Sequence, residues 1–268
     1  MIDISVIIPV YKPDDLFYEC MDSLTLQTFP VDRFEVIVVL NGERVPFEER
    51  VLNYISRSSL HIKFFYCETA DVSGARNKGM EEAAGRYISF IDADDFISAC
   101  FLEKLFTAAE NGTGFSISNV CPCDNTKKPV YDRWVDKGLR NIVPGKAYPH
   151  SKTRLFFAVP WGKLMQKDAC KKALFDSRFD YGEDALYMFR IEPFLPMATM
   201  ADWEAVYYKR ELSTSLSKKK RGFTNVARLH VGLMKEYWRL FFSKKQRYSL
   251  RMFVRRNLAL LMHIIKGR

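Results

Sequence analysis

The sequence predicts an α/β protein built on a doubly wound, mostly parallel sheet. Short apolar runs such as FEVIVVL (34–40) and YISFID (87–92) alternate with amphipathic segments of helical length through residues 1–120. Strands that are buried on both faces of a parallel sheet are apolar throughout, as these runs are. Polar residues follow several of the runs, at the strand ends where open α/β sheets bind ligands. We therefore expect a nucleotide-binding type of sheet with helices on both faces.

The individual elements follow from the same patterns. We expect strands from residue 2 through 8 and onward, at 34–40, 61–67, 87–92 and 115–120, and helices near 14–26, 47–56, 73–84 and 99–110. Residues 121–150 hold four prolines and two glycines, which predicts a long loop over the site. Farther on, a strand entering a short helix is expected at 161–168, a helix at 183–194 and one strand at 197–210.

Charge is distributed very unevenly along the 268 residues, whose net charge is +9. Residues 218–268 contain fifteen lysines and arginines against one glutamate, whereas residues 1–217 have five more acidic than basic side chains. Apolar residues recur at helical spacing in this tail, which suits helices lying on an anionic membrane surface. The alternative is a helical cap packed on the rest of the chain or on a second subunit. The uncharged stretch 257–265 is too short to span a bilayer.

Cysteine usage and the N-terminal sequence indicate a cytoplasmic protein, peripheral on the inner membrane face if the tail binds lipid. The six cysteines show no C-x-x-C spacing and fall largely in apolar segments, as reduced thiols do. A metal or redox pair at Cys121-Pro122-Cys123 has no second pair or nearby histidine to support it. The first ten residues lack the basic region of a signal peptide.

Three carboxylates, Asp92, Asp94 and Asp95, stand at the end of the strand at 87–92 and directly after it. In an extended chain Asp92 and Asp94 lie on the same side, and two like charges at close range need a cation or a protonation shift. A hard divalent ion, Mg²⁺ or Mn²⁺, would relieve this repulsion through oxygen ligands. Alternatively, the run is a solvated turn in which Asp95 or Ser98 caps the next helix.

Four segments in this order and spacing resemble the family 2 inverting glycosyltransferases over about residues 3–215. They are SVIIPVYK (5–12), VVLNGE (38–43), SGARNKGMEEAAGRYISFIDADD (73–95) and GEDALYMFR (182–190). The resemblance implies a GT-A fold over 1–217, with a Rossmann-like nucleotide-sugar-binding half (1–120) and an acceptor-binding half (121–217). Residues 218–268 would follow as a basic helical extension. It also implies a nucleoside-diphosphate-sugar donor, a UDP-sugar, and Mn²⁺ or Mg²⁺ as cofactor.

The resemblance also assigns roles to the acidic residues. In the D-x-D motif Asp92-Ala93-Asp94, Asp94 would ligate the metal and Asp92 would contact the donor ribose or the metal's waters. Asp95 would lie near the sugar. Asp184 matches the catalytic base that takes the acceptor hydroxyl's proton, and Glu183 would orient the helix or that hydroxyl. Alternatively, both acids simply favour the positive end of a helix dipole.

Further donor contacts are expected at the strand ends. Pro9, Val10 and Tyr11 would line the base and ribose pocket, and Arg76 would reach the nucleobase or a phosphate unless it forms a surface ion pair. Asn41 stands where a carboxylate of the family usually contacts uracil, and its amide can both accept and donate. Lys163, Arg210 and Lys218 are candidate diphosphate or acceptor contacts, or simply surface cations.

The expected acceptor is a hydroxyl of a glycan or lipid-linked oligosaccharide in polysaccharide biosynthesis, and a homodimer is possible. Two other functions compete with hexosyl or N-acetylhexosaminyl transfer. A sugar nucleotidyltransferase would need a glycine-rich loop after the first strand, where Pro9-Val10-Tyr11-Lys12 stands instead. A nucleic-acid-binding protein would use the basic tail together with Tyr237, Trp238 and Tyr248.

Overall fold

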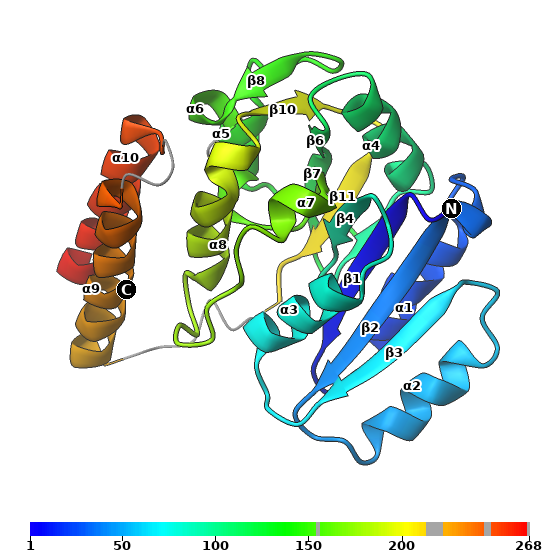
Figure 1. Cartoon of the computed structure of the whole chain (residues 1–268). Coiled ribbons are helices and arrows are strands. Elements are labelled where there is room, and N and C mark those ends of the chain that lie inside the picture. Colours follow the sequence, from blue (N-terminus) through cyan, green and yellow to red (C-terminus); the bar gives the residue numbers. More distant parts are fainter. Residues whose placement is uncertain (154–155, 213–221, 244–247, 267–268) are drawn as a thin grey trace.

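A mixed sheet of eight strands forms the centre of the molecule (Figure 1). This computed structural model describes residues 1–153, 156–212, 222–243 and 248–266. The strands follow the order β3-β2-β1-β4-β9-β6-β10-β8, and β1, β2, β3 and β4 pair in parallel. Strand β9 is antiparallel to both of its neighbours. The bounds are β1 Ile4–Val10, β2 Phe34–Asn41, β3 Ile62–Cys67, β4 Tyr87–Phe90, β6 Phe115–Ile117, β8 Ala147–Pro149, β9 Lys163–Gln166 and β10 Met197–Met200.

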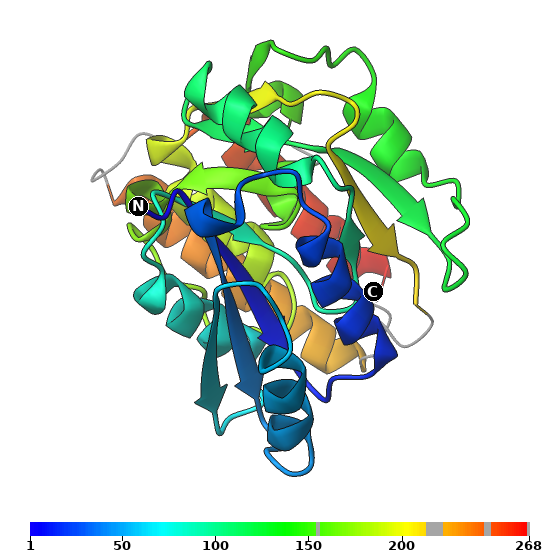
Figure 2. The same cartoon turned by 90° about the vertical axis from the view of Figure 1, so that its right-hand side faces the viewer.

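Helices cover both faces of this sheet, as the apolar strands predicted. Alternate residues of β1 belong to two separate apolar cores, with Val6 in one and Ile7 in the other. Figure 2, seen from the side of α1 and α2, places the sheet in front of α9 and α10. The helices are α1 Asp15–Thr25, α2 Phe47–Ile55, α3 Val72–Glu82, α4 Phe101–Glu110, α5 Arg133–Leu139, α6 His150–Thr153, α7 Lys167–Cys170, α8 Glu183–Ile191, α9 Phe223–Phe242 and α10 Leu250–Lys266, with 3-10 turns η1 Val31–Arg33, η2 Phe156–Ala158 and η3 Glu192–Phe194.

A second, three-stranded sheet corrects two of the expected strands. It contains β5 (Phe96–Ile97), β11 (Val206–Arg210) and β7 (Asn119–Cys123). The single strands expected at 115–120 and 197–210 are therefore wrong, because each segment leaves the large sheet and enters the small one. At the second crossing, the backbone amide of Ala205 donates to the Asp202 carbonyl (3.0 Å) and the Asp202 side chain accepts from the Glu204 amide (3.0 Å). This aspartate-stabilised turn ends β10.

Residues 121–150 do not form the long loop expected from their prolines and glycines. The segment contains the end of β7, helix α5 and strand β8. Prolines are tolerated at these places, since Pro149 lies on β8 at the edge of the large sheet and Pro122 in a short strand at the edge of the small one. The connector expected at 213–220, with Lys218, lies outside the described residues.

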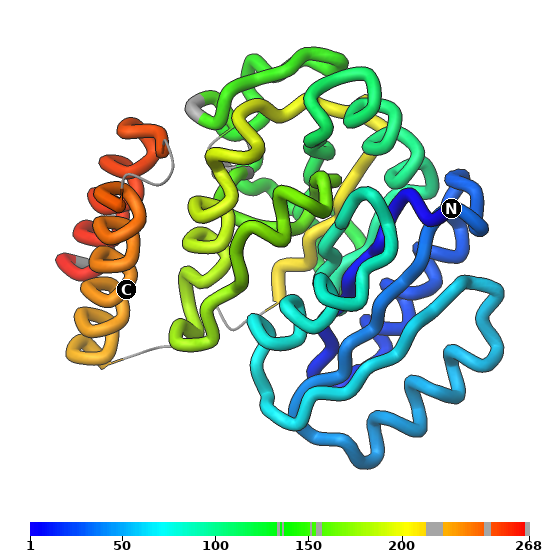
Figure 3. The backbone as a smooth tube through the Cα atoms, in the orientation of Figure 1, coloured from blue at the N-terminus to red at the C-terminus, as the bar shows by residue number. Residues whose placement is uncertain are grey.

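The basic tail packs as two helices, of which α9 lies against α8 and α10 lies against α9 and α6 (Figure 3). Val226, Leu233 and Tyr237 of α9 are each at most 2% exposed, and the Tyr237 ring meets Phe189 of α8 edge to face at 4.9 Å. The alternative of a packed cap therefore holds for α9, while the domain boundary at residue 217 stays a prediction. In the described part of the chain, no helix has the length and hydropathy needed to cross a bilayer.

Gly85, which precedes β4 and lies against β1, should be intolerant of substitution. A Cβ atom at Gly85 would lie 2.5 Å from the backbone nitrogen of Ser5 in β1. Because that backbone belongs to the central sheet, we expect Gly85→Ala to lower the free energy of unfolding by about 1–3 kcal/mol in urea titrations. Gly222→Ala is the control, since nothing lies within 4 Å of its added Cβ. Equal midpoints for the two variants would contradict this view of the packing.

Candidate active site

Three parallel strands bring the predicted donor residues to one edge of the sheet. Val10 aligns with Leu40 and Ile7 with Phe90, so β1, β2 and β4 end close together. The Asn41 side-chain amide donates to the Val10 carbonyl at 2.8 Å, which ties the first two ends together. Tyr11 is 55% exposed beyond them. The predicted contact of this exposed ring and buried amide with the donor's base and ribose stays a prediction.

Arg76 joins two acids that lie far apart in the sequence, Asp92 after β4 and Asp184 in α8. Its guanidinium donates to Asp184 Oδ1 at 2.6 Å and to Asp92 Oδ1 at 2.9 Å. Arg76 is 3% exposed, so it forms a buried ion pair and not the surface pair considered as the alternative. Its predicted contact with the nucleobase or a phosphate stays a prediction. One guanidinium thus holds the donor-side carboxylate and the predicted base together.

Contacts with Phe175 and the cap of α3 hold the Arg76 side chain in place. The guanidinium lies over the Phe175 ring, with 5.2 Å between its central carbon and the ring centre. Asn77, the next residue, donates to the Phe175 carbonyl (3.0 Å) and accepts from the Phe175 amide (2.9 Å). Helix α3 itself begins at an Asp71 cap, whose carboxylate accepts from two backbone amides. The arginine is therefore held in place by helix, ring and carboxylates together.

Tyr207 and Arg210 of β11 hold the turn after β4 in place. Asp95 is 3% exposed and points inward, accepting from the Tyr207 hydroxyl (2.7 Å) and from the Arg210 backbone amide (2.7 Å). The Arg210 guanidinium donates to the Asp94 carbonyl (2.6 Å) and also contacts Glu19. Arg210 is 2% exposed and so is not a surface cation. Both residues hold the turn in this structure, and their predicted sugar and diphosphate contacts stay predictions.

Asp94 has the character expected of a metal ligand. Burial, together with the nearby charge of Asp92, raises the pKa of Asp94 to about 6. No salt bridge to its carboxylate occurs in the described chain. No cluster of three or more His, Cys, Asp or Glu side chains suited to a metal occurs there either. Two carboxylates plus substrate phosphates nevertheless form the oxygen-rich set that Mg²⁺ and Mn²⁺ prefer, so the residues fit such an ion.

Asp184 and Glu183 form the first turn of α8. Burial raises the pKa of Asp184, and the charge of Arg76 opposes that shift. Burial and the Asp184 charge raise the pKa of Glu183 to about 7. The preceding Gly182 has φ +78°, and an added Cβ would lie 2.7 Å from Leu233 of α9. The tail helix therefore supports the turn that presents both acids.

Lys163 lies inside the protein beside this site. It is 1% exposed, which excludes the alternative of a surface cation, and its ammonium donates to the Trp161 carbonyl at 2.9 Å. Burial lowers the pKa of Lys163 to about 7, against the opposing charge of Asp184. A contact with the diphosphate stays a prediction.

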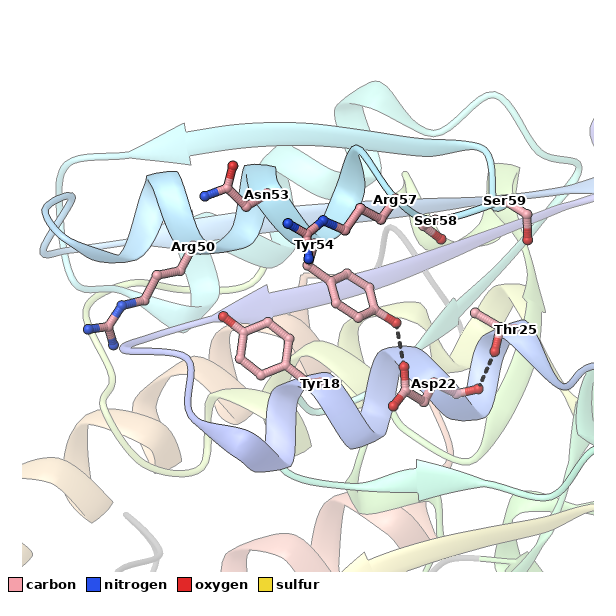
Figure 4. Close-up of a pocket in the computed structure, with 9 residues that line it drawn as sticks. All are labelled: Tyr18, Asp22, Thr25, Arg50, Asn53, Tyr54, Arg57, Ser58 and Ser59. Atoms are coloured by element: carbon pink, nitrogen blue, oxygen red, sulfur yellow. Dashed lines mark hydrogen bonds between the residues drawn. The ribbon is translucent and has the colours of Figure 1, made fainter.

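A groove elsewhere on the molecule is separate from these residues. Its volume is about 700 Å³, and it lies between α1 and α2 (Figure 4). Tyr18 and Tyr54 stand within it, and the Tyr54 hydroxyl donates to Asp22 at 2.7 Å. None of the predicted site residues lines it.

Several residues that organise the site were not predicted. Tyr207 donates to Asp95 and accepts from the Asp92 backbone amide (3.1 Å), while Phe175 and Leu233 support Arg76 and Gly182. Each is an ordinary apolar or aromatic residue, so the sequence carries no signal that separates it from a residue of the core.

The fold and the site define an α/β protein with acidic side chains gathered at the ends of its parallel strands. The family model described as Glycosyl transferase family 2 matches residues 5–174. The chain belongs to this family.

Individual proteins agree with that assignment. The poly(ribitol-phosphate) beta-glucosyltransferase of Bacillus spizizenii is 34% identical over 191 residues, covering 69% of this chain and 28% of its own length. The structure of Staphylococcus aureus TarS 1-349 with UDP-GlcNAc has a TM-score of 0.76 at 18% identity, covering 98% of this chain and 73% of that one. The mannosyltransferase PcManGT of Pyrobaculum calidifontis with GDP-Man and Mn²⁺ has a TM-score of 0.60 at 14% identity, covering 97% of this chain and 69% of that one. These structural likenesses confirm the GT-A fold.

The chain spans 63% or less of the length of the first curated relatives it matches.

The buried lysine predicts how stability depends on pH. The pKa of Lys163 is about 7 in the folded chain and near its ordinary 10.5 when unfolded, so the unfolded chain binds more protons between these values. The free energy of unfolding should therefore rise with pH across this window. We expect Lys163→Met to remove that rise and to stabilise the protein at pH 6 by roughly 1–4 kcal/mol. Chemical denaturation at several pH values measures this, with the exposed Lys146→Met as control. A rise that persists in Lys163→Met would contradict it.

Proposed function

We propose that this chain is a metal-dependent inverting glycosyltransferase. It moves a sugar from a nucleoside-diphosphate sugar, a UDP-sugar, to a hydroxyl of a glycan or lipid-linked oligosaccharide in polysaccharide biosynthesis. The observation that carries this proposal is the bridge from Arg76 to Asp92 and Asp184. It puts a donor-side carboxylate and a candidate base on one guanidinium. TarS with UDP-GlcNAc, which shares the fold, supports a uridine donor.

Asp184 acts as the general base. Its carboxylate takes the proton of the acceptor hydroxyl while that oxygen bonds to the anomeric carbon of the donor sugar. The bond from that carbon to the diphosphate breaks on the opposite face, its electron pair leaves with the diphosphate, and the configuration inverts. Burial raises the pKa of Asp184, which makes it a stronger base, and Arg76 keeps it oriented. Glu183, beside it, is placed to orient the acceptor hydroxyl.

The turn after β4 serves the donor. Asp94 and Asp92 would hold a divalent ion, which supplies positive charge against the departing diphosphate when bound. Tyr11 and Asn41 would bind the base and ribose, with Pro9 and Val10 forming the buried floor. Because Asn41 already donates to the Val10 carbonyl, its amide oxygen is left to accept from a nucleobase N–H.

Membership of family 2 favours sugar transfer over the two competing functions. A nucleotidyltransferase would still need phosphate-binding glycines after β1, and the sequence has Pro9-Val10-Tyr11-Lys12 there. Of the three rings that nucleic-acid binding by the tail would use, Tyr237 is 1% exposed and Tyr248 is partly buried, so only Trp238, at 51%, is exposed for stacking.

Replacing the proposed base tests the reaction directly. We expect Asp184→Asn to retain donor binding but to lower the rate of transfer by about 10²–10⁴-fold, because an amide cannot take the hydroxyl's proton. Donor affinity is measured by calorimetry and transfer by nucleoside-diphosphate release with acceptor present. The exposed Asp168→Asn serves as the matched control. Unchanged turnover in Asp184→Asn would exclude this residue as the base.

A thermal-shift screen tests the donor and the metal. We expect UDP with Mn²⁺ to raise the unfolding temperature, since a ligand at a hundred times its Kd adds about 2.7 kcal/mol of stability. Asp94→Asn should lose the Mn²⁺-dependent part of this shift, whereas Asp32→Asn, an exposed acid outside the site, should keep it. A larger shift with another nucleoside diphosphate would replace uridine, and equal shifts with and without Mn²⁺ would overturn the metal assignment.

A further inference from the structure

Helix α10 exposes a continuous apolar stripe along its whole length. Its members, called here the α10 stripe, are Leu250, Val254, Leu258, Leu261 and Ile265, whose spacing of four, four, three and four residues places them on one helical face. Each is between 43% and 74% exposed. Soluble proteins seldom expose apolar side chains in such a contiguous row, and where they do the row marks an interaction site.

The opposite face of α10 is already used in packing. Met252 and Phe253 are buried in the core, and Phe253 stacks on Phe241 of α9 with ring centres 4.2 Å apart. The Arg256 guanidinium donates to the Phe157 carbonyl at 3.2 Å, back toward the sheet. The stripe is therefore not the core-facing side of the helix, and in the described structure it points away from the rest of the chain.

Helix α9 extends this surface and adds positive charge to it. Its outward positions combine basic and apolar side chains, all exposed: Arg228, Val231, Lys235, Trp238 and Phe242. The Trp238 indole donates to Asn257 of α10 at 3.0 Å, so the two exposed faces adjoin at this tryptophan. Figures 1 and 3 show the two helices side by side on the outside of the molecule.

The charge of the tail determines which partner suits this surface. Residues 218–268 carry fifteen basic side chains and one acid, Glu236. That acid pairs with Arg178, outside the tail, and with Arg239, one of the fifteen, so the tail keeps a large excess of positive charge. A second copy of the chain would bring like charges together, and a nucleic acid would leave the leucines without an apolar partner. An anionic lipid surface satisfies both features, since acyl chains accept the apolar stripe and headgroups attract the basic residues.

We propose that α10 lies in the interface of an anionic membrane, with the α10 stripe and Trp238 inserted among the lipids. Helix α9 then connects this anchor to the catalytic half, because its buried face packs on α8 and its Leu233 contacts Gly182, just before Glu183 and Asp184. The proposal rests on the proposed function only in that a lipid-linked acceptor would be met at this surface. Membrane binding itself requires no donor, metal or catalysis.

Vesicle flotation of the full chain tests the proposal. We expect the protein to float with vesicles of phosphatidylglycerol and phosphatidylcholine in equal parts and to stay behind with phosphatidylcholine alone. Added salt should weaken binding without abolishing it, because the headgroup attraction is screened while the apolar contact is not. Failure to float with anionic vesicles overturns the proposal.

Substitutions locate the contact. We expect the double variant Leu258→Glu, Leu261→Glu to lower partitioning into anionic vesicles by roughly tenfold or more. The two leucines no longer bury apolar area among the lipids, and the two glutamates are repelled by the negative headgroups. The control is Leu26→Glu, an exposed leucine just after α1. Tryptophan fluorescence provides a second measurement that does not depend on the double variant. We expect the emission maximum to shift to shorter wavelength on vesicle binding, and this shift to be lost in Trp238→Phe. Unchanged partitioning of the double variant, or no fluorescence change, contradicts the assignment of this face.

Two further readouts keep this proposal apart from the proposed function. Donor turnover with a water-soluble acceptor should be the same in the double variant and in Leu26→Glu, so loss of turnover without loss of flotation would bear on the reaction alone. Light scattering on the lipid-free protein reports its mass. A dimer that the double variant converts to a monomer would assign the stripe to self-association and overturn the membrane proposal.

Discussion

The buried guanidinium of Arg76 is the interaction on which the rest of the site depends. It bridges Asp92, at the end of β4, and Asp184, at the start of α8. A charged group this deeply buried is costly unless its partners are present, and removing one partner of a buried ion pair typically costs about 3–5 kcal/mol. Helix α3, the β4 turn and α8 therefore have to be in place together. The site is a property of the folded chain, assembled from segments that lie 108 residues apart.

Neighbouring carboxylates acquire different properties because their surroundings differ. Asp95 faces inward and is held by Tyr207 and Arg210, so it organises the turn. Asp94 is next to it in the sequence, yet it has no salt bridge in the described structure and its pKa is raised to about 6. Burial also raises the pKa of Asp184, with Arg76 in opposition. The same side chain is thus a structural acceptor, a candidate metal ligand or a candidate base, according to its partners.

The tail packs against α8, the helix that carries the candidate base. Besides the contact of Leu233 with Gly182, Glu236 of α9 accepts from Arg178 at 2.9 Å, and Arg178 is paired with Asp176 at 2.7 Å. This ion-pair chain joins α9 to the segment that leads into α8. The composition of the tail suggested a separate extension. Its helices instead support the candidate active site on one side and present an apolar surface on the other.

Sequence alone determined the alternation of strands and helices, the parallel strand ends and the D-x-D and GED acids, because apolar runs, helical spacing and short polar motifs are local signals. It also identified the excess positive charge of the tail. Only the tertiary structure decided that residues 197–210 divide between two sheets, that Arg76 lies between Asp92 and Asp184, and that Asp95 points inward. It likewise decided which face of each tail helix is buried and which is exposed. These outcomes depend on partners distant in the sequence, such as Tyr207 or Leu233, whose apolar character fits any core position equally well.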